Sequence, residues 1–123
     1  MEVISFTPGA DAGEACVRFA GTEPVFMGHF TDAPLLPGVV LIDVAVEFVA
    51  RAMRRPLRLE RLSSVKFCRA VLPEEEIRFE FKVMPEDGCG GRIKVTGRWF
   101  RNAEKIAEMS FWAVPDETRG ETP

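Results

Sequence analysis

The sequence predicts an α+β fold in which one long helix packs against an antiparallel sheet. Residues 39–53 form an apolar segment whose polar members recur every four residues, which is typical of a helix. From residue 61 onward, apolar and polar residues alternate, which is typical of strands. With 123 residues the chain has the length of one domain. We place this domain at residues 1–114 and expect a flexible polar tail at residues 115–123.

The first strand is predicted at residues 14–19, where Ala15, Val17 and Phe19 fall on one face. Residues 22–30 are predicted as a second short extended segment. A loop rich in turn-forming residues, which include Pro34, Pro37 and Gly38, follows and precedes the helix.

The helix predicted at residues 39–53 carries Asp43, Glu47 and Arg51 on one stripe of an otherwise apolar cylinder. Such a helix is expected to be surrounded by protein on most sides. We expect Pro56 to end it, because proline cannot continue a helix.

Four strands are predicted in the second half, at residues 61–71, 77–84, 92–101 and 105–114, and the last three form a meander. The positions expected to face inward are Val65, Phe67, Ile77, Phe79, Phe81, Val83, Ile93, Val95, Gly97 and Trp99. One helix covers little of such a sheet, so a partner subunit is expected.

Composition excludes several classes of protein. Sixteen Lys and Arg against nineteen Asp and Glu give a net charge of −3, which does not favour nucleic acid. Cys16, Cys68 and Cys89 form no Cys-x-x-Cys pair, so neither a metal site nor a disulfide framework is expected. The longest apolar stretch is too short to span a bilayer, and the first residues do not resemble a signal peptide. We therefore expect a cytoplasmic protein without membrane insertion.

The segment 28–43 holds the residues that suggest chemistry. His29, the single histidine, can exchange a proton near neutral pH. The Gly38 N–H at the helix start can stabilise a developing negative charge. Burial of Asp43, with Glu47 one turn further on, is expected to favour a protonated carboxyl group. Together these groups suit proton abstraction next to a carbonyl, although a surface histidine, an ordinary turn and a solvated helix stripe explain them as well.

The same segment resembles the signature of the β-hydroxyacyl-acyl carrier protein dehydratases, a family of the hotdog-fold superfamily. The residues that match are His29, Phe30, Pro34, Leu36, Pro37, Gly38 and Val39, with Asp43 at the acidic position. Residues 64–73 resemble a second family motif, and the similarity spans residues 14–114.

The resemblance implies a hotdog fold, with the sheet wrapped around the helix and dimers formed edge to edge. It implies a hydro-lyase that converts a 3-hydroxyacyl thioester on acyl carrier protein into the trans-2-enoyl thioester. His29 and Asp43 would be the catalytic residues, contributed by different protomers, and Gly38 would hold the thioester carbonyl. Phe30, Val39 and Glu47 would line the substrate site. No metal or cofactor is implied, and the assembly would be a homodimer or a higher oligomer.

Some positions depart from the family pattern. Thr31, Val44 and Glu47 replace proline, alanine and glutamine, and the residues at 73–76 replace Pro-Gly-Asp. The reaction would serve fatty-acid synthesis or a related polyketide or aryl-polyene synthesis, and these differences suggest a specialised dehydratase, for example one of the latter pathways.

A run of basic residues follows the helix. It comprises Arg51, Arg54, Arg55, Arg58 and Arg61, followed by Lys66 and Arg69, with Glu60 as the one acid between them. This run is expected either to dock an acidic carrier protein or to be a solvated helix end and strand edge.

Two other functions remain open at this stage. A hotdog thioesterase would release a free acid instead of an enoyl thioester. A non-catalytic hotdog subunit would bind acyl chains or support an active partner. Five large aromatic residues either line an acyl tunnel or form the core; they are Phe48, Phe79, Phe81, Trp99 and Phe111.

Overall fold

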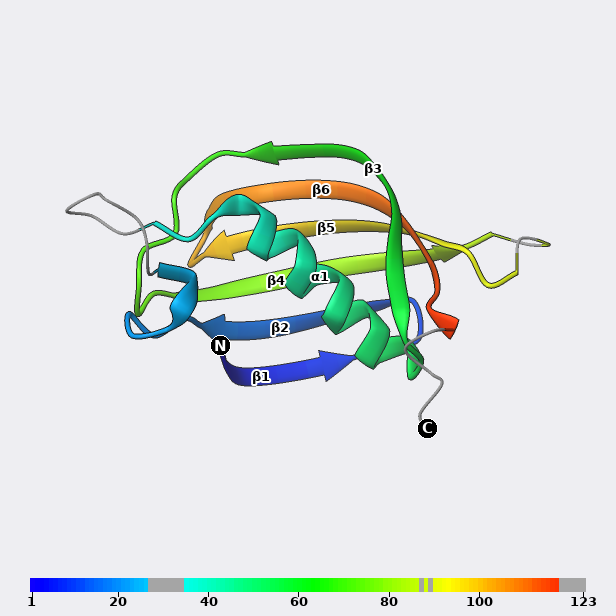
Figure 1. Ribbon diagram of the computed structural model, residues 1–123, viewed down its shortest axis with the longest axis horizontal. Helices are drawn as coiled ribbons and strands as arrows, with labels where there is room; N and C mark the ends of the chain where they lie inside the picture. Colours follow the sequence, from blue (N-terminus) through cyan, green and yellow to red (C-terminus); the bar gives the residue numbers. More distant parts are fainter. Residues whose placement is uncertain (27–34, 87, 89, 118–123) are drawn as a thin grey trace.

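The computed structural model describes residues 1–26, 35–86, 88 and 90–117. One long helix lies across one face of a six-stranded antiparallel sheet (Figure 1). The elements in chain order are β1 Glu2–Pro8, β2 Ala12–Arg18, the short 3₁₀ helix η1 Pro24–Phe26, α1 Gly38–Met53, β3 Leu57–Phe67, β4 Glu76–Pro85, β5 Ile93–Arg101 and β6 Glu104–Pro115. The strand order across the sheet is β1-β2-β4-β5-β6-β3.

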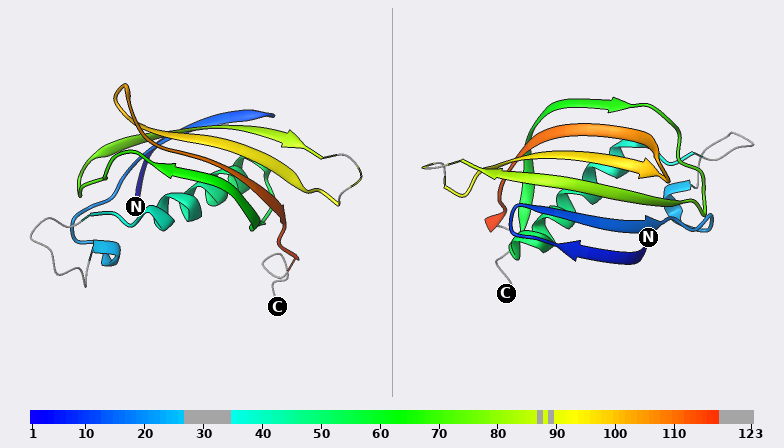
Figure 2. Two further views of the ribbon diagram at one scale, coloured as in Figure 1. Left: turned by 90° about the horizontal axis from the view of Figure 1, so that it is seen from above. Right: turned by 180° about the vertical axis from the view of Figure 1, so that it is seen from behind.

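This arrangement confirms the predicted α+β class and is that of the hotdog fold. Figure 2 shows the sheet curving around the helix, so the core lies between them. The alternation predicted for β2, β4 and β5 is also confirmed, because the expected inward residues of these strands are buried.

Aromatic rings fill the centre of the core. The rings of Phe79 and Trp99 stack with centroids 4.6 Å apart, and those of Phe79 and Phe81 lie 5.3 Å apart. Glycines make room for them in the neighbouring strands, since a Cβ on Gly97 would lie 2.6 Å from the Phe79 ring and one on Gly13 would lie 2.4 Å from the Phe81 ring. Phe48 and Phe111 are fully buried as well, so these five aromatic residues form the core.

The helix has the predicted extent, but its end has a different cause from the one expected. Arg54 adopts the left-handed conformation with φ 57°, and its N–H donates to the carbonyls of Ala50 and Arg51. This C-cap stops the helix at Met53, before Pro56 is reached.

The structure differs from the prediction in two segments, one near the N-terminus and one at the end of the chain. Residues 24–26 form a 3₁₀ helix, in which the Phe26 N–H donates to Glu23, where an extended segment was expected. Residues 27–30 of that segment lie outside the described residues. The last strand continues to Pro115, and the buried Asp116 donates its N–H to the Pro56 carbonyl at 3.0 Å. The tail therefore begins later than predicted, and its residues 118–123 are not described.

Strand β3 begins four residues earlier than predicted and ends at Phe67 instead of residue 71. It stops there because the N–H groups of Cys68 and Arg69 both donate to the Ile106 carbonyl, at 2.7 and 3.1 Å, which breaks the regular ladder. The prediction that its apolar residues are buried is wrong for the single chain: Val65 is 36% exposed and Phe67 47%.

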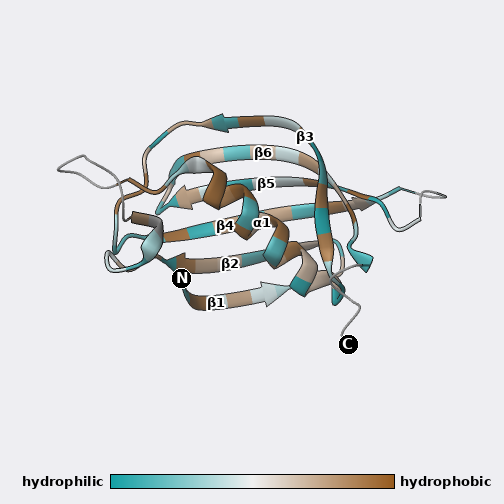
Figure 3. Ribbon diagram, in the orientation of Figure 1, coloured by the Kyte–Doolittle hydropathy of each residue, from teal (hydrophilic) through white to brown (hydrophobic). Residues whose placement is uncertain are grey.

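The apolar residues of β3 nevertheless face the helix side of the sheet. Two bulges in the pairing with β6 bring irregularly spaced apolar residues to one face. Their partners across the ladder are the buried residues Ala113, Phe111, Met109 and Ala107. We call this set, which comprises Leu59, Leu62, Val65 and Phe67, the β3 apolar row; Figure 3 shows apolar residues along both β3 and the helix.

The glycine in β5 gives a first prediction. Gly97→Ala is expected to lower the free energy of unfolding by about 1–3 kcal/mol, because its Cβ collides with the buried Phe79 ring. Urea unfolding measures this change. The control is Thr96→Ala on the exposed face of the same strand, which is expected to change stability by less than about 0.5 kcal/mol. Equal effects of the two substitutions would contradict the packing argument.

Candidate active site

The structure describes the part of the predicted site that lies on the helix α1. His29 and Phe30 lie outside the described residues. Gly38 and Val39 form the first turn of α1, where Val39 is 60% exposed. Asp43 follows on the same helix and is exposed, so the expectation that it is buried is wrong for the single chain. The reason is that the helix packs on the sheet with its opposite face, and nothing in the described part of the chain covers Asp43.

A groove of about 450 Å³ opens at the helix start. One wall comes from the helix start and the residues before it, and the other from the end of β3 and the segment after it. The lining residues are Leu35, Leu36, Gly38, Val39 and Leu41 on one side and Phe67, Cys68, Arg69, Ala70 and Val71 on the other. A hydrogen bond from the Leu36 N–H to the Val71 carbonyl at 2.9 Å ties the two walls together, so the groove is built into the fold.

The helix start supplies backbone donors beside this groove. Pro37 is the N-cap residue, and among the described residues no side chain makes a cap hydrogen bond to the helix start. The Val40 N–H donates to the Pro37 carbonyl at 3.0 Å. Unpaired amides and the positive end of the helix dipole favour an anionic oxygen at such a position. The arrangement can therefore stabilise negative charge on a carbonyl oxygen, as the sequence predicts for Gly38.

One contact at this site was missed by sequence reasoning. The Phe67 ring, which was expected in the core, lies against the backbone of Gly38. A Cβ at position 38 would lie 2.6 Å from the Phe67 Cζ. A signal for it was present, since glycine stands at a helix start where side-chain caps are usual and an aromatic residue occurs in the second matching motif.

A network of charges lies at the rim of the groove. The Arg69 guanidinium donates to Glu104 at 3.3 Å, and Arg101 donates both to Glu104 and to Glu75. The hydrogen bond from Arg101, together with the charges of Arg101 and Arg69, lowers the pKa of the Glu104 carboxyl group. Arg69, with a side chain that is 61% exposed, brings this network of ion pairs to the edge of the groove.

The arginines of the basic run differ in their partners, although Arg51, Arg54 and Arg55 line one shallow pocket at the end of the helix. Arg51 pairs with Glu47 at 3.5 Å and lies over the Phe48 ring. Arg55 donates to the Gly91 carbonyl at 2.8 Å, which holds the turn after the helix against the loop before β5. The four basic residues of this run that are exposed and for which no ion pair is found within the described part of the chain are Arg54, Arg58, Arg61 and Lys66.

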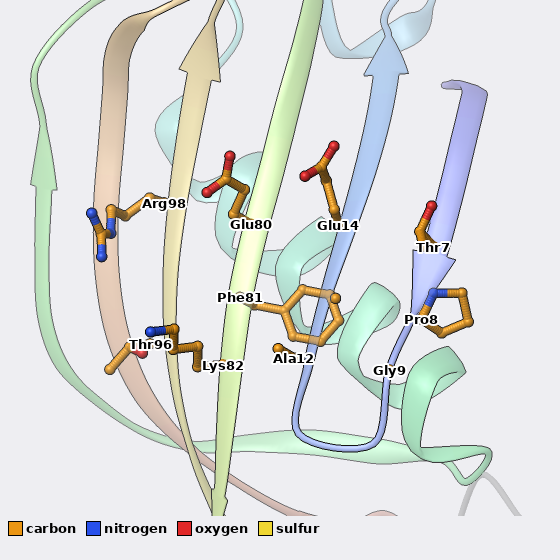
Figure 4. A pocket seen from close by; sticks show the side chains of 11 residues that line it. Thr7, Pro8, Gly9, Ala12, Glu14, Glu80, Phe81, Lys82, Thr96 and Arg98 are labelled. Carbon is orange, nitrogen blue, oxygen red and sulfur yellow. The ribbon is translucent and has the colours of Figure 1, made fainter.

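A second hollow of about 450 Å³ lies on the outer face of the sheet (Figure 4). Charged side chains from neighbouring strands line it, among them Glu14, Glu80 and Arg98. Glu80 is already bound by Arg78 at 2.7 Å. No residue of the matching motifs lines this hollow, so we place the candidate site at the helix start and not here.

Neither a metal centre nor a membrane span is found in the described ranges. Across residues 1–26, 35–86, 88 and 90–117, no three His, Cys, Asp or Glu residues come together as metal ligands. Over the same residues, no helix has the length and apolar character needed to cross a bilayer.

Comparison with known proteins identifies related sequences. The family model of ApeI-like dehydratases matches residues 8–99. A 3-hydroxyacyl-[acyl-carrier-protein] dehydratase FabZ from Shewanella loihica is 29% identical over 116 residues, which cover 83% of this chain and 75% of the relative. A FabZ from Methylobacterium radiotolerans is 28% identical over 109 residues, which cover 78% of this chain and 65% of the relative.

Solved structures share the fold. The dehydratase heterocomplex ApeI:P from Xenorhabdus doucetiae contains a chain that matches with a TM-score of 0.76 and 18% identity, over 91% of this chain and 96% of that one. An uncharacterized protein from Pyrococcus horikoshii matches with a TM-score of 0.69 and 18% identity, over 94% of this chain and 82% of that one. Identities this low establish the fold alone.

The different environments of Arg54 and Arg55 give a second prediction. Arg55→Ala is expected to lower the free energy of unfolding by about 1 kcal/mol, because it removes a partly buried hydrogen bond to the Gly91 carbonyl. Arg54→Ala, at the exposed neighbour, is the matched control and is expected to change stability by less than about 0.5 kcal/mol. Urea unfolding of both variants measures the difference. Indistinguishable midpoints would show that Arg55 has no structural role.

Proposed function

The chain belongs to the ApeI-like dehydratase family, and we propose that its substrate is a 3-hydroxyacyl thioester on acyl carrier protein, which it converts in the cytoplasm to the trans-2-enoyl thioester and water. The FabZ relatives, named for this reaction, support the proposal. The observation that carries it is that Gly38 lines a groove at the first turn of α1, while Asp43 lies about one turn further along the same helix.

The active unit that we propose is a homodimer formed through β3. The β3 apolar row faces the helix side of the sheet at its edge but remains 36–47% exposed. Burial of such a row stabilises association through the hydrophobic effect. A free strand edge also offers unpaired backbone groups for an antiparallel partner. A second copy of the chain meets both requirements and supplies cover for the exposed Asp43.

The proposed reaction needs one base and one acid. His29 removes the proton from the carbon next to the thioester carbonyl, and the electron pair forms the new carbon–carbon double bond. Asp43 of the partner protomer, in its neutral form, gives a proton to the departing hydroxyl group, which leaves as water. The Gly38 N–H stabilises the negative charge that develops on the carbonyl oxygen. Proton exchange with solvent restores both side chains. Phe30, Val39 and Glu47 are proposed to line the substrate site.

The same dimer offers a place for the carrier protein. In one chain, Gly38 and Arg54 lie at opposite ends of a 16-residue helix, which is about 24 Å long. Two-fold pairing of β3 is antiparallel, so the beginning of the partner's strand, which carries Arg58 and Arg61, would lie beside the end that carries Phe67. The exposed arginines would then flank the groove of the other protomer and attract an acidic carrier protein.

A dehydration assay tests the proposed reaction. Purified protein with a 3-hydroxyacyl-carrier substrate is expected to form enoyl thioester, which mass spectrometry distinguishes from the free acid and thiol of a thioesterase. His29→Ala and Asp43→Asn are each expected to lower kcat by about 100-fold or more, because each removes a proton-transfer group. Activity that survives both substitutions would refute the site, and inactivity of the wild type would refute the reaction.

Mixing the two variants tests the shared site. After subunit exchange, half of the dimers carry one intact site, so about a quarter of the wild-type activity is expected to return. Failure of the mixture to recover activity, with exchange verified by mass spectrometry, would place both groups on one protomer.

Charge reversal tests the docking surface. The double substitution Arg54→Glu/Arg58→Glu is expected to raise KM for the carrier-bound substrate by about tenfold or more and to leave turnover of a pantetheine thioester unchanged, because the lost attraction concerns the carrier protein. Lys82→Glu on the outer face of the sheet is the control. Equal KM values for the double variant and the wild type would reject the docking surface.

A further inference from the structure

Phe67 has an unusual position for a large aromatic residue. It ends the edge strand β3 and is 47% exposed, yet its ring touches the first residue of α1. The tip of the ring makes the contact, since a Cβ at position 38 would lie 2.6, 2.8 and 2.9 Å from the Phe67 Cζ, Cε1 and Cε2 atoms. Real Cβ atoms do not approach other atoms so closely. The contact therefore accounts for glycine at position 38.

The backbone on both sides of this contact is held by hydrogen bonds. Immediately after Phe67, the N–H groups of Cys68 and Arg69 are fixed to the Ile106 carbonyl. On the helix side, the Leu36 N–H is fixed to the Val71 carbonyl, two residues before Gly38. Phe67 and Gly38 line the same groove. The ring is thus an apolar wall beside the helix start, carried on a backbone that these hydrogen bonds hold.

We propose that Phe67 is a positioning residue, whose ring holds the acyl thioester in line with the Gly38 amide and keeps water away from that amide. This proposal rests on the proposed function, in which the Gly38 N–H stabilises the carbonyl oxygen. A hydrogen bond to a developing charge is strongest where water is excluded. A wall that limits sideways movement of the thioester also raises the fraction of bound substrate in the reactive geometry.

Substitutions of Phe67 test the wall. Phe67→Ala is expected to lower kcat by about tenfold and to change KM by less than about threefold, because positioning is gained mainly in the transition state. Phe67→Leu keeps an apolar side chain and is expected to retain at least half of the wild-type kcat. The control is Phe100→Ala, at a partly exposed aromatic residue near the end of β5, with an expected change in kcat below about twofold. Thermal unfolding and size-exclusion chromatography establish that the variants fold and assemble as the wild type does.

A double substitution tests the coupling with Gly38. Gly38→Ala alone is expected to lower kcat/KM by about 100-fold, because the new methyl group pushes the helix start and the ring apart. In Gly38→Ala/Phe67→Ala the collision is removed, so the double variant is expected to be about tenfold more active than Gly38→Ala.

The outcomes separate the two proposals. Absence of dehydration by the wild type would overturn the proposed function and, with it, the role of Phe67. With an active wild type, a kcat for Phe67→Ala equal to that of Phe100→Ala would overturn the positioning role alone. A double variant no more active than Gly38→Ala would overturn the coupling. If Phe67→Ala fails to fold, Phe67→Val replaces it, because its smaller side chain leaves the amide open to water. Its kcat is then expected to fall more than about threefold with KM unchanged, and a kcat equal to that of Phe100→Ala would overturn the positioning role.

Discussion

One helix cannot cover the inner face of a six-stranded sheet, and most features of this molecule depend on that limit. The helix lies over the centre of the sheet, where it buries the stacked aromatic rings. The edge strand β3 receives less cover, and its apolar row remains partly exposed. Burial of apolar surface is the main favourable term in association. The partly exposed edge is therefore where the proposed dimer would form, and its end at Phe67 lines the groove of the candidate active site.

The regularity of strand pairing decides which strands the sequence could predict. In β4 the residues Ile77, Phe79 and Phe81 alternate strictly, because a regular ladder places every second side chain inward, and all three are buried as predicted. In β3 two bulges change the spacing of the apolar residues, so a period of two gives the wrong bounds. Bulges depend on the pairing with a distant strand, which local sequence patterns do not contain.

The candidate site shows a similar division. The position of Gly38 at the helix start followed from local signals, namely a Pro-Gly step before an apolar helical segment. The exposure of Asp43 did not follow, because a stripe of polar residues has the same sequence pattern whether water or a partner subunit covers it. The contact between Phe67 and Gly38 joins residues 29 positions apart, and only the tertiary fold brings them together.

Glycine at position 38 therefore meets two requirements at once. Small size allows a substrate to approach the helix amides, and it also allows the Phe67 ring to pack against the backbone. A larger residue at position 38 would fill the space of the Phe67 ring. The N-cap residue before it is Pro37, whose side chain cannot accept a hydrogen bond, so this helix start is less stable than one that a serine or aspartate caps. Such a local loss of stability at a helix start is expected where the backbone itself takes part in binding.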